Sequence, residues 1–199
     1  MEKPVLFLDL DRTMFDTDQL YVFWGIDPER RAPYMQATVE GKIPEPDWAN
    51  MVYPETKSFL ERAKERYHLV LLTRTLNISF QKMKFVRSGL SKFFDGALYT
   101  TAFRAKGSLV KRYLELYGGD RSHAVFIDDE PANIDDVKRA LPGIFAIHMC
   151  RSGDQSERVI PEEYIRADVV AEDFSEVAWY LRMYAPHPIY SAKNKNHGS

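Results

Sequence analysis

Near its amino terminus the chain has the stretch Val5-Leu6-Phe7-Leu8-Asp9-Leu10-Asp11-Arg12-Thr13. Its first four residues are apolar, which is typical of a short strand buried in a parallel sheet. Side chains alternate between the two faces of an extended chain, so Asp9 and Asp11 are expected to point the same way. Two like charges held together favour a metal site or a division of acid and base roles. The alternative interpretation is a turn after the strand, since Asp and Thr favour turns.

Composition indicates an ordinary globular protein. The 199 residues suit one domain with room for a small insert, and 45% of them are hydrophobic. The net charge is −2, and neither the basic nor the acidic residues form long runs, so the charge pattern does not indicate binding to nucleic acids or membranes. The single cysteine, Cys150, argues against a disulfide framework and fits a reducing compartment. No apolar run reaches membrane length. We therefore expect a cytoplasmic protein.

The rest of the chain alternates predicted strands with predicted helices. Strands are expected at 69–73, 98–100, 124–127, 144–147 and from 169, and helices from 54 and at 77–87, 106–117, 133–140 and 174–183. This alternation predicts an α/β fold, a doubly wound parallel sheet with right-handed crossovers.

One segment interrupts the alternation. Between 16 and 53 the chain has prolines at 28, 33, 44 and 46, with short helical patterns at 29–40 and 46–52. We predict a small helical insert at 16–53. Residues 1–15 and 54–184 then form the core, and 185–199 a flexible tail.

Polar residues follow three of the predicted strands. Asp9 and Asp11 follow the first, Thr73 ends the second, and Asp128-Asp129 end a later one. Ligands of such sheets bind beyond the carboxyl ends of the strands. Each residue alone fits a cap or turn, but their shared position predicts a site. Carboxylates such as Asp9 and Asp128 suit Mg²⁺, and such a group can also attack phosphorus while a second acid moves the proton.

In these residues the sequence resembles the haloacid dehalogenase superfamily, specifically its Mg²⁺-dependent phosphatases, which implies a Rossmann-like core. Four motifs carry the resemblance in order: Asp9, Asp11 and Thr13; then Thr73; then Lys106, with Lys111 and Arg104 as nearby alternatives; then Asp128-Asp129 followed by Asn133. The segment 16–53 resembles the helical cap that this family places after its first motif.

The resemblance implies a role for each matched residue. Asp9 would be the nucleophile and a metal ligand, and Asp11 the general acid and base, with its backbone carbonyl on the metal. Thr73 and Lys106 would hold the phosphoryl group. Asp128 would bind Mg²⁺ beside Asp129, and which of the two is the direct ligand stays open.

Some residues near the motifs have less specific interpretations. Arg12 stands where the family often has glycine, and a solvated side chain is expected there. In the insert, Tyr21, Trp24, Arg30 and Arg31 could contact a substrate, although packing of the aromatic rings and a solvated basic turn are favoured.

The expected function is Mg²⁺-dependent hydrolysis of a phosphorylated small molecule through an aspartyl phosphate. Alternatives are a phosphotransferase or mutase with the same intermediate, and a phosphate-binding protein without turnover. Asp9 and Asp11 together argue against the last, because binding alone needs neither as an acid. Halide-transferring members of the family lack the two-acid motif, so dehalogenation is disfavoured. A receiver-type signalling domain is also disfavoured, because its acidic pair follows only the first strand. Neither the substrate nor the oligomeric state follows from the sequence.

Overall fold

The computed structural model describes residues 3–117, 123–151 and 162–183. They form a six-stranded sheet in the order β3-β2-β1-β4-β5-β6. Its strands are β1 (Val5–Leu8), β2 (His68–Arg74), β3 (Gly96–Thr100), β4 (Val125–Asp128), β5 (Phe145–Met149) and β6 (Val169–Ala171). Every neighbouring pair is parallel, which confirms the predicted doubly wound sheet.

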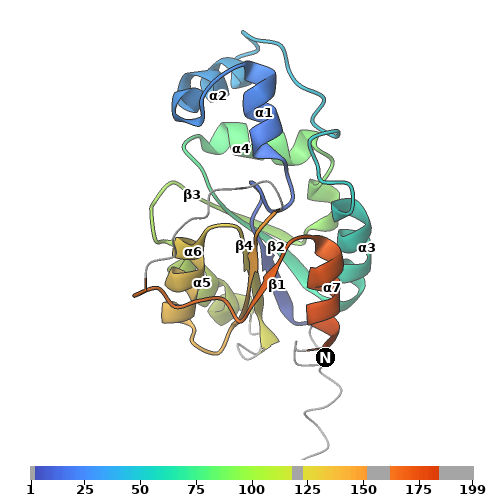
Figure 1. The fold of residues 1–199 in the computed structure, drawn as a ribbon, viewed down its shortest axis with the longest axis vertical. Helices are drawn as coiled ribbons and strands as arrows, with labels where there is room; N and C mark the ends of the chain where they lie inside the picture. Colours follow the sequence, from blue (N-terminus) through green and yellow to red (C-terminus); the bar gives the residue numbers. More distant parts are fainter. Residues whose placement is uncertain (1–2, 118–122, 152–161, 184–199) are drawn as a thin grey trace, which may run out of the picture.

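Helices cover both faces of this sheet (Figure 1). On one side are α3 (Thr56–Arg66) and α7 (Phe174–Met183), and on the other are α5 (Lys106–Tyr117) and α6 (Pro131–Ala140). The helix α4 (Ile78–Arg87) follows β2 and lies next to the insert. The first strand alternates between the two cores, with Leu6 and Leu8 in one and Val5 and Phe7 in the other. Burial on both faces explains its unbroken apolar run.

The insert forms one end of the molecule (Figure 1). It contains α1 (Thr17–Trp24), the 3₁₀ turn η1 (Pro28–Arg30) and α2 (Arg31–Val39). The Trp24 ring packs 5.6 Å from the Phe80 ring of α4, as expected for an aromatic packing residue. The Asn77 side chain donates a hydrogen bond of 3.0 Å to Gln36, which joins the start of α4 to α2. Apolar side chains of the insert such as Leu20 belong to the same buried cluster as Leu8.

The helix predicted at 46–52 is wrong, because the chain forms turns there. The carboxylate of Asp47 accepts hydrogen bonds from the backbone of Ala49 and Asn50, which favours a turn over a continuing helix. The division into core and cap stays a prediction, and the expected tail at 185–199 lies outside the described residues.

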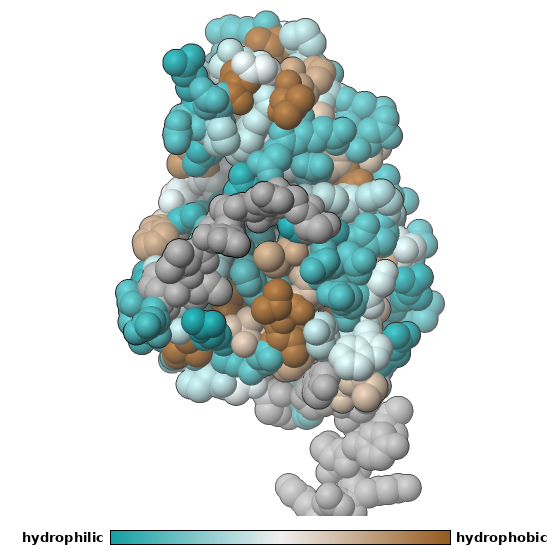
Figure 2. Space-filling model, viewed as in Figure 1, coloured by the Kyte–Doolittle hydropathy of each residue, from teal (hydrophilic) through white to brown (hydrophobic). Residues whose placement is uncertain are grey.

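The face of the molecule seen in Figure 2 is mostly hydrophilic, with apolar side chains in small scattered groups. Among the described residues, none of the helices has the length and apolar character that a membrane crossing needs. The cytoplasmic location stays a prediction.

Candidate active site

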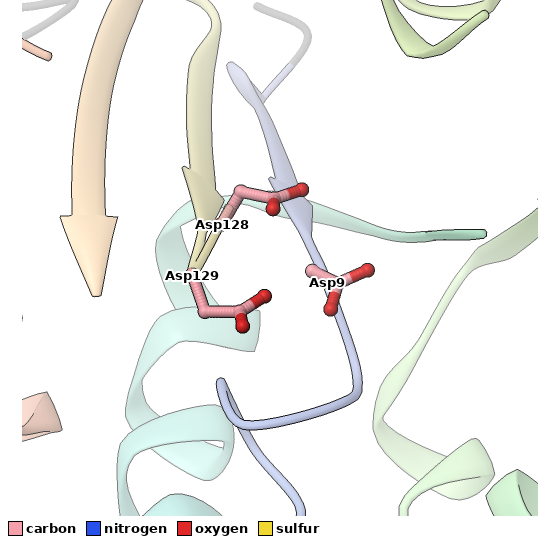
Figure 3. Close-up of side chains that lie close together, drawn as sticks. All are labelled: Asp9, Asp128 and Asp129. Carbon is pink, nitrogen blue, oxygen red and sulfur yellow. The ribbon is translucent and has the colours of Figure 1, made fainter. Parts of the chain in front are cut away.

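Three carboxylates meet where the strand order reverses. The strands β1 and β4 are neighbours, and the backbone amide of Asp9 donates a hydrogen bond of 3.0 Å to the carbonyl of Ile127. This reversal point is where open α/β sheets bind ligands. Oxygen atoms of Asp9, Asp128 and Asp129 all lie within 4.8 Å of one another, and their side chains gather in one space at the strand ends (Figure 3).

A buried lysine bridges two of these acids. Lys106 is the first residue of α5, and its Nζ lies 2.6 Å from an oxygen of Asp9 and 2.6 Å from an oxygen of Asp128. Its neighbour Gly107 lies against α6, where an added Cβ would be 2.5 Å from the carbonyl oxygen of Asp136. The absence of a side chain therefore lets the start of α5, which carries Lys106, pack closely against α6. Of the three basic candidates, Lys106 is the one that the structure places against Asp9 and Asp128.

Burial dominates the electrostatics of this group. Burial raises the pKa of Asp9 to about 7, with the Lys106 ammonium opposing the rise and Asp128 and Asp11 adding to it. Burial alone would lower the pKa of Lys106, but the carboxylates of Asp128 and Asp9 outweigh it and raise that pKa. The lysine therefore stays charged at neutral pH.

Asp128 and Asp129 have different surroundings. Asp128 is fully buried; one oxygen accepts from Lys106, and the other accepts from the backbone amide of Glu130 and the side chain of Asn133, each at 2.9 Å. Asp129 is partly exposed and lines the cavity in front of the strands. The structure therefore brings Asp128 to the site as the partner of Lys106, and Asp129 as a carboxylate facing the cavity.

Asp11 has a lysine of its own. Its carboxylate accepts hydrogen bonds from Lys84, from Thr17 and, at 2.6 Å, from Gln81. Lys84 is only 1% exposed, and its ammonium lies 4.9 Å from the centre of the Phe15 ring. Burial alone would raise the pKa of Asp11, but Lys84 outweighs it and, with Thr17 and Gln81, holds that pKa below its usual range. Asp11 is therefore an anion at neutral pH.

Lys84 and Gln81 are missing from the set predicted from the sequence. Both lie on α4, and a signal for them exists in its pattern: Gln81, Lys84 and Ser88 recur at helical spacing on the side that also carries Phe80 and Phe85. All five are buried. Polar residues on the apolar face of a helix imply buried partners.

Thr73 is fully buried, and its hydroxyl accepts a hydrogen bond of 2.8 Å from Gln81, which also donates to Asp11. The structure thus connects Thr73 to Asp11 through one amide. Two residues further on, Thr75 lines the cavity. The phosphate-binding role of Thr73 stays a prediction.

Arg12 has a backbone conformation that is usual for glycine rather than for arginine. Its φ is 53°, in the left-handed region where glycine is favoured and where the family often has glycine. Its side chain is not simply solvated, as was expected, because the guanidinium lies 2.7 Å from Asp18 of α1. The ion pair ties the motif loop to the first helix of the insert.

A cavity of about 390 Å³ lies in front of the strand ends. Asp9, Asp11, Lys106 and Asp129 form part of its wall. Its size lies within the usual range for small-molecule pockets. The arrangement places a buried carboxylate, a second acid, a fixed cation and a further carboxylate around one space.

Known proteins share this arrangement of strands. A family model described as "Protein of unknown function (DUF2608)" matches residues 58–150, and no curated protein matches the chain. The structure is similar to a putative haloacid dehalogenase-like hydrolase from Burkholderia xenovorans LB400, with a TM-score of 0.70, 20% identity, and coverage of 94% of this chain and 100% of that one.

Two further solved structures differ in the activity that their names state. A HAD phosphatase from Thermococcus onnurineus has a TM-score of 0.58 and 18% identity, covering 89% of this chain and 97% of that one. An L-2-haloacid dehalogenase from Xanthobacter autotrophicus, with chloropropionic acid covalently bound, has a TM-score of 0.62 and 13% identity, covering 93% and 100%. These likenesses show that the chain has the fold of the haloacid dehalogenase-like hydrolases, as the resemblance implied.

Proposed function

We propose that the protein is a Mg²⁺-dependent hydrolase of phosphate monoesters that works through an aspartyl phosphate on Asp9. The observation that carries the proposal is the placement of Asp9, with one oxygen 2.6 Å from Lys106 and with Asp11 and Asp129 in the same cavity wall. A fixed cation beside a buried carboxylate suits the transfer of a group that carries negative charge.

Asp9 and Asp11 have different roles in the two chemical steps of the proposed reaction. In the first, an oxygen of Asp9 attacks phosphorus and the bond from phosphorus to the ester oxygen breaks. When Asp11 carries a proton, which Lys84 disfavours at neutral pH, it gives that proton to the leaving oxygen. In the second, water attacks the phosphorus of the aspartyl phosphate and Asp11 takes a proton from that water. The bond from phosphorus to Asp9 breaks, phosphate leaves, and both acids return to their starting state. Lys106 stabilises charge on the phosphoryl oxygens throughout.

The carboxylates fit Mg²⁺, which takes hard oxygen ligands and few of them from protein. We propose Asp9 and Asp129 as side-chain ligands and the backbone carbonyl of Asp11 as a third. Both oxygens of Asp128 already accept hydrogen bonds, so its proposed role is to fix Lys106 rather than to bind the metal directly. When bound, Mg²⁺ supplies positive charge that neutralises the phosphoryl oxygens.

The test is hydrolysis of 4-nitrophenyl phosphate by the purified chain, with Mg²⁺ and with excess EDTA. We expect turnover with Mg²⁺, its loss in EDTA, and its loss in Asp9→Asn, which removes the nucleophile. The control is Glu65→Gln, the same carboxylate-to-amide change on the exposed side of α3. Wild-type turnover in Asp9→Asn overturns the nucleophile, and full activity in EDTA overturns the metal. Adding alcohol acceptors and measuring phosphate transferred to them distinguishes hydrolysis from phosphotransfer.

A further inference from the structure

The cavity has more positive charge in its wall than the reacting centre uses. Besides Lys106, Arg12, Arg31 and Arg74 line it. They come from three places in the fold: the loop after β1, the first residue of α2 and the last residue of β2. The insert therefore supplies one of these arginines and the core two, all to the same space.

These arginines differ in how their charge is balanced. Arg12 is paired with Asp18. Arg31 donates a hydrogen bond of 2.6 Å to the backbone carbonyl of Pro28, and the Arg74 guanidinium lies 5.1 Å from the centre of the Phe103 ring. Within residues 3–117, 123–151 and 162–183, neither Arg31 nor Arg74 forms an ion pair with a carboxylate. Each guanidinium has five N–H donors, so most of those on Arg31 and Arg74 remain for a ligand.

A single phosphoryl group does not account for this charge. The acids nearest the strand ends already have Lys106 and Lys84 as partners. A cavity of about 390 Å³ also has room for more than one phosphoryl group, and the rings of Tyr21 and Phe103 line it. Aromatic walls suit the organic part of a ligand, and guanidinium groups suit carboxylate or phosphate, which they bind in a bidentate manner.

We propose that the substrate is a phosphate monoester with a second anionic group, and that Arg31 and Arg74 bind this second group. The shared chemistry is a planar guanidinium pair facing an oxyanion, which either a carboxylate or a second phosphate supplies. The inference rests on the proposed hydrolysis and adds the substrate class to it. It also gives Arg31 the substrate contact that the sequence offered as the alternative to a solvated basic turn.

The test compares three aryl phosphates with nearly equal leaving groups: 4-methylphenyl phosphate, 4-(carboxymethyl)phenyl phosphate and 4-(phosphonomethyl)phenyl phosphate. The methylene insulates the phenol oxygen from the added charge, so kcat/KM reports binding of the second group. We expect one or both charged substrates to exceed the neutral one by about 10- to 100-fold, as charge-assisted hydrogen bonds predict. The better of the two identifies carboxylate or phosphate as the preferred anion.

Arg31→Met and Arg74→Met should each lower this charged-to-neutral ratio by about tenfold. Each variant removes one guanidinium and leaves an uncharged side chain of similar volume to arginine. Arg62→Met, on the exposed side of α3, is the matched control and should keep the wild-type ratio. Arg31 lies on a partly exposed helix end, so its variant guards against a folding failure of Arg74→Met in β2. Equal kcat/KM on all three substrates, or a wild-type ratio in both variants, overturns the inference.

A binding measurement separates this outcome from failure of the proposed function. The probes are 4-methylbenzylphosphonate and 4-(carboxymethyl)benzylphosphonate, neither of which can be hydrolysed, and their Kd values are measured by calorimetry. Charge-dependent binding that both arginine variants weaken supports the second-anion site even without turnover, while the hydrolysis proposal then fails. Equal Kd values for the two probes, in a protein that hydrolyses 4-methylphenyl phosphate and does not prefer the phosphonomethyl substrate, overturn the second-anion site alone.

Discussion

At the scale of single residues, the contact between Lys84 and Asp11 sets the protonation of Asp11, the acid of the proposed reaction. Asp11 must carry a proton when it protonates a leaving oxygen, whereas the ammonium of Lys84 favours its anion. At neutral pH the protein should therefore act best on substrates whose leaving oxygen needs no proton, such as aryl phosphates. With Asp9 kept ionised by the proposed Mg²⁺, alkyl phosphates should react faster as the pH falls toward the pKa of Asp11.

Lys84→Met tests this arrangement. Removing the ammonium should raise the pKa of Asp11, so the pH above which alkyl phosphate hydrolysis declines should move up by about one to three units. The measurement is the pH dependence of kcat/KM on an alkyl and an aryl phosphate. The control is Lys82→Met, an exposed lysine of the same helix. An unchanged alkyl profile in Lys84→Met would contradict the role given to this lysine.

Asp9 should make the metal-free protein less stable at higher pH. Its pKa is about 7 when folded, against an ordinary 3.8, so the folded state binds more protons between these values. The free energy of unfolding contributed by Asp9 therefore falls as the pH rises from about 4 to 7. The test is urea unfolding in EDTA at pH 5 and at pH 8. From pH 5 to pH 8 the free energy of unfolding of wild type should fall by at least about 1 kcal/mol more than that of Asp9→Asn, since one pKa unit corresponds to about 1.4 kcal/mol. Parallel pH dependence in the two proteins would show that burial does not perturb Asp9.

The strand ends predicted Asp9, Asp11 and Asp128 as neighbours, because parallel strands end at one edge, and the family resemblance added Lys106. Lys84 escaped the prediction for a physical reason. It meets Asp11 across 73 positions of sequence, and lysines on helices are usually solvated, so only the tertiary fold reveals its burial.

Elements that are buried on both faces were the most predictable. The apolar runs at 69–73 and 124–127 correspond to β2 and β4, and the helix predicted at 106–117 is α5. The segment 46–52 was less predictable, because its few apolar residues fit either a helix or a turn. Hydrogen bonds that the backbone of Ala49 and Asn50 donates to Asp47 favour the turn.

The close approach of α5 and α6 is a property of elements, and Gly107→Ala tests it. The new Cβ would lie 2.5 Å from the Asp136 carbonyl oxygen and 2.9 Å from the Cβ of Ala140, so α5 must move. Overpacking of this kind costs about 1–3 kcal/mol. The Tm should fall by roughly 2–12 °C for a chain of this size, and kcat should fall as Lys106 shifts. Gly143→Ala, where nothing lies within 4 Å of the added Cβ, is the control. Equal Tm values for Gly107→Ala and wild type would show that α5 and α6 adjust to the added methyl group without cost.

At the scale of the whole molecule, the sheet order creates the site. The sequence predicted a parallel sheet, but its motifs do not encode that β1 lies between β2 and β4. Nor do they encode the cavity, to which the insert and the core both contribute walls. Arg31 and Arg74 are 43 positions apart on different elements, and no local pattern relates them.

Because of the same long-range assembly, the proposed Mg²⁺ site exists only in the folded chain. Asp9 and Asp129 are 120 positions apart, so the unfolded chain does not hold them together. A ligand that binds only the folded state stabilises it by about 2.7 kcal/mol at 100 times its Kd. For a chain of this length that corresponds to a Tm rise of roughly 5–10 °C.

Thermal unfolding with and without Mg²⁺, at matched ionic strength, measures this rise. Asp129→Asn should lose most of it, because the variant removes a ligand that faces the cavity. Glu65→Gln removes one negative charge from exposed α3 and should keep the full rise, which excludes a general effect of net charge. Acids that merely serve as turn residues would give no specific rise and no difference between the variants. A rise of wild-type size in Asp129→Asn would instead assign the direct contact to Asp128, whose hydrogen bonds to Glu130 and Asn133 would then have to yield to the metal.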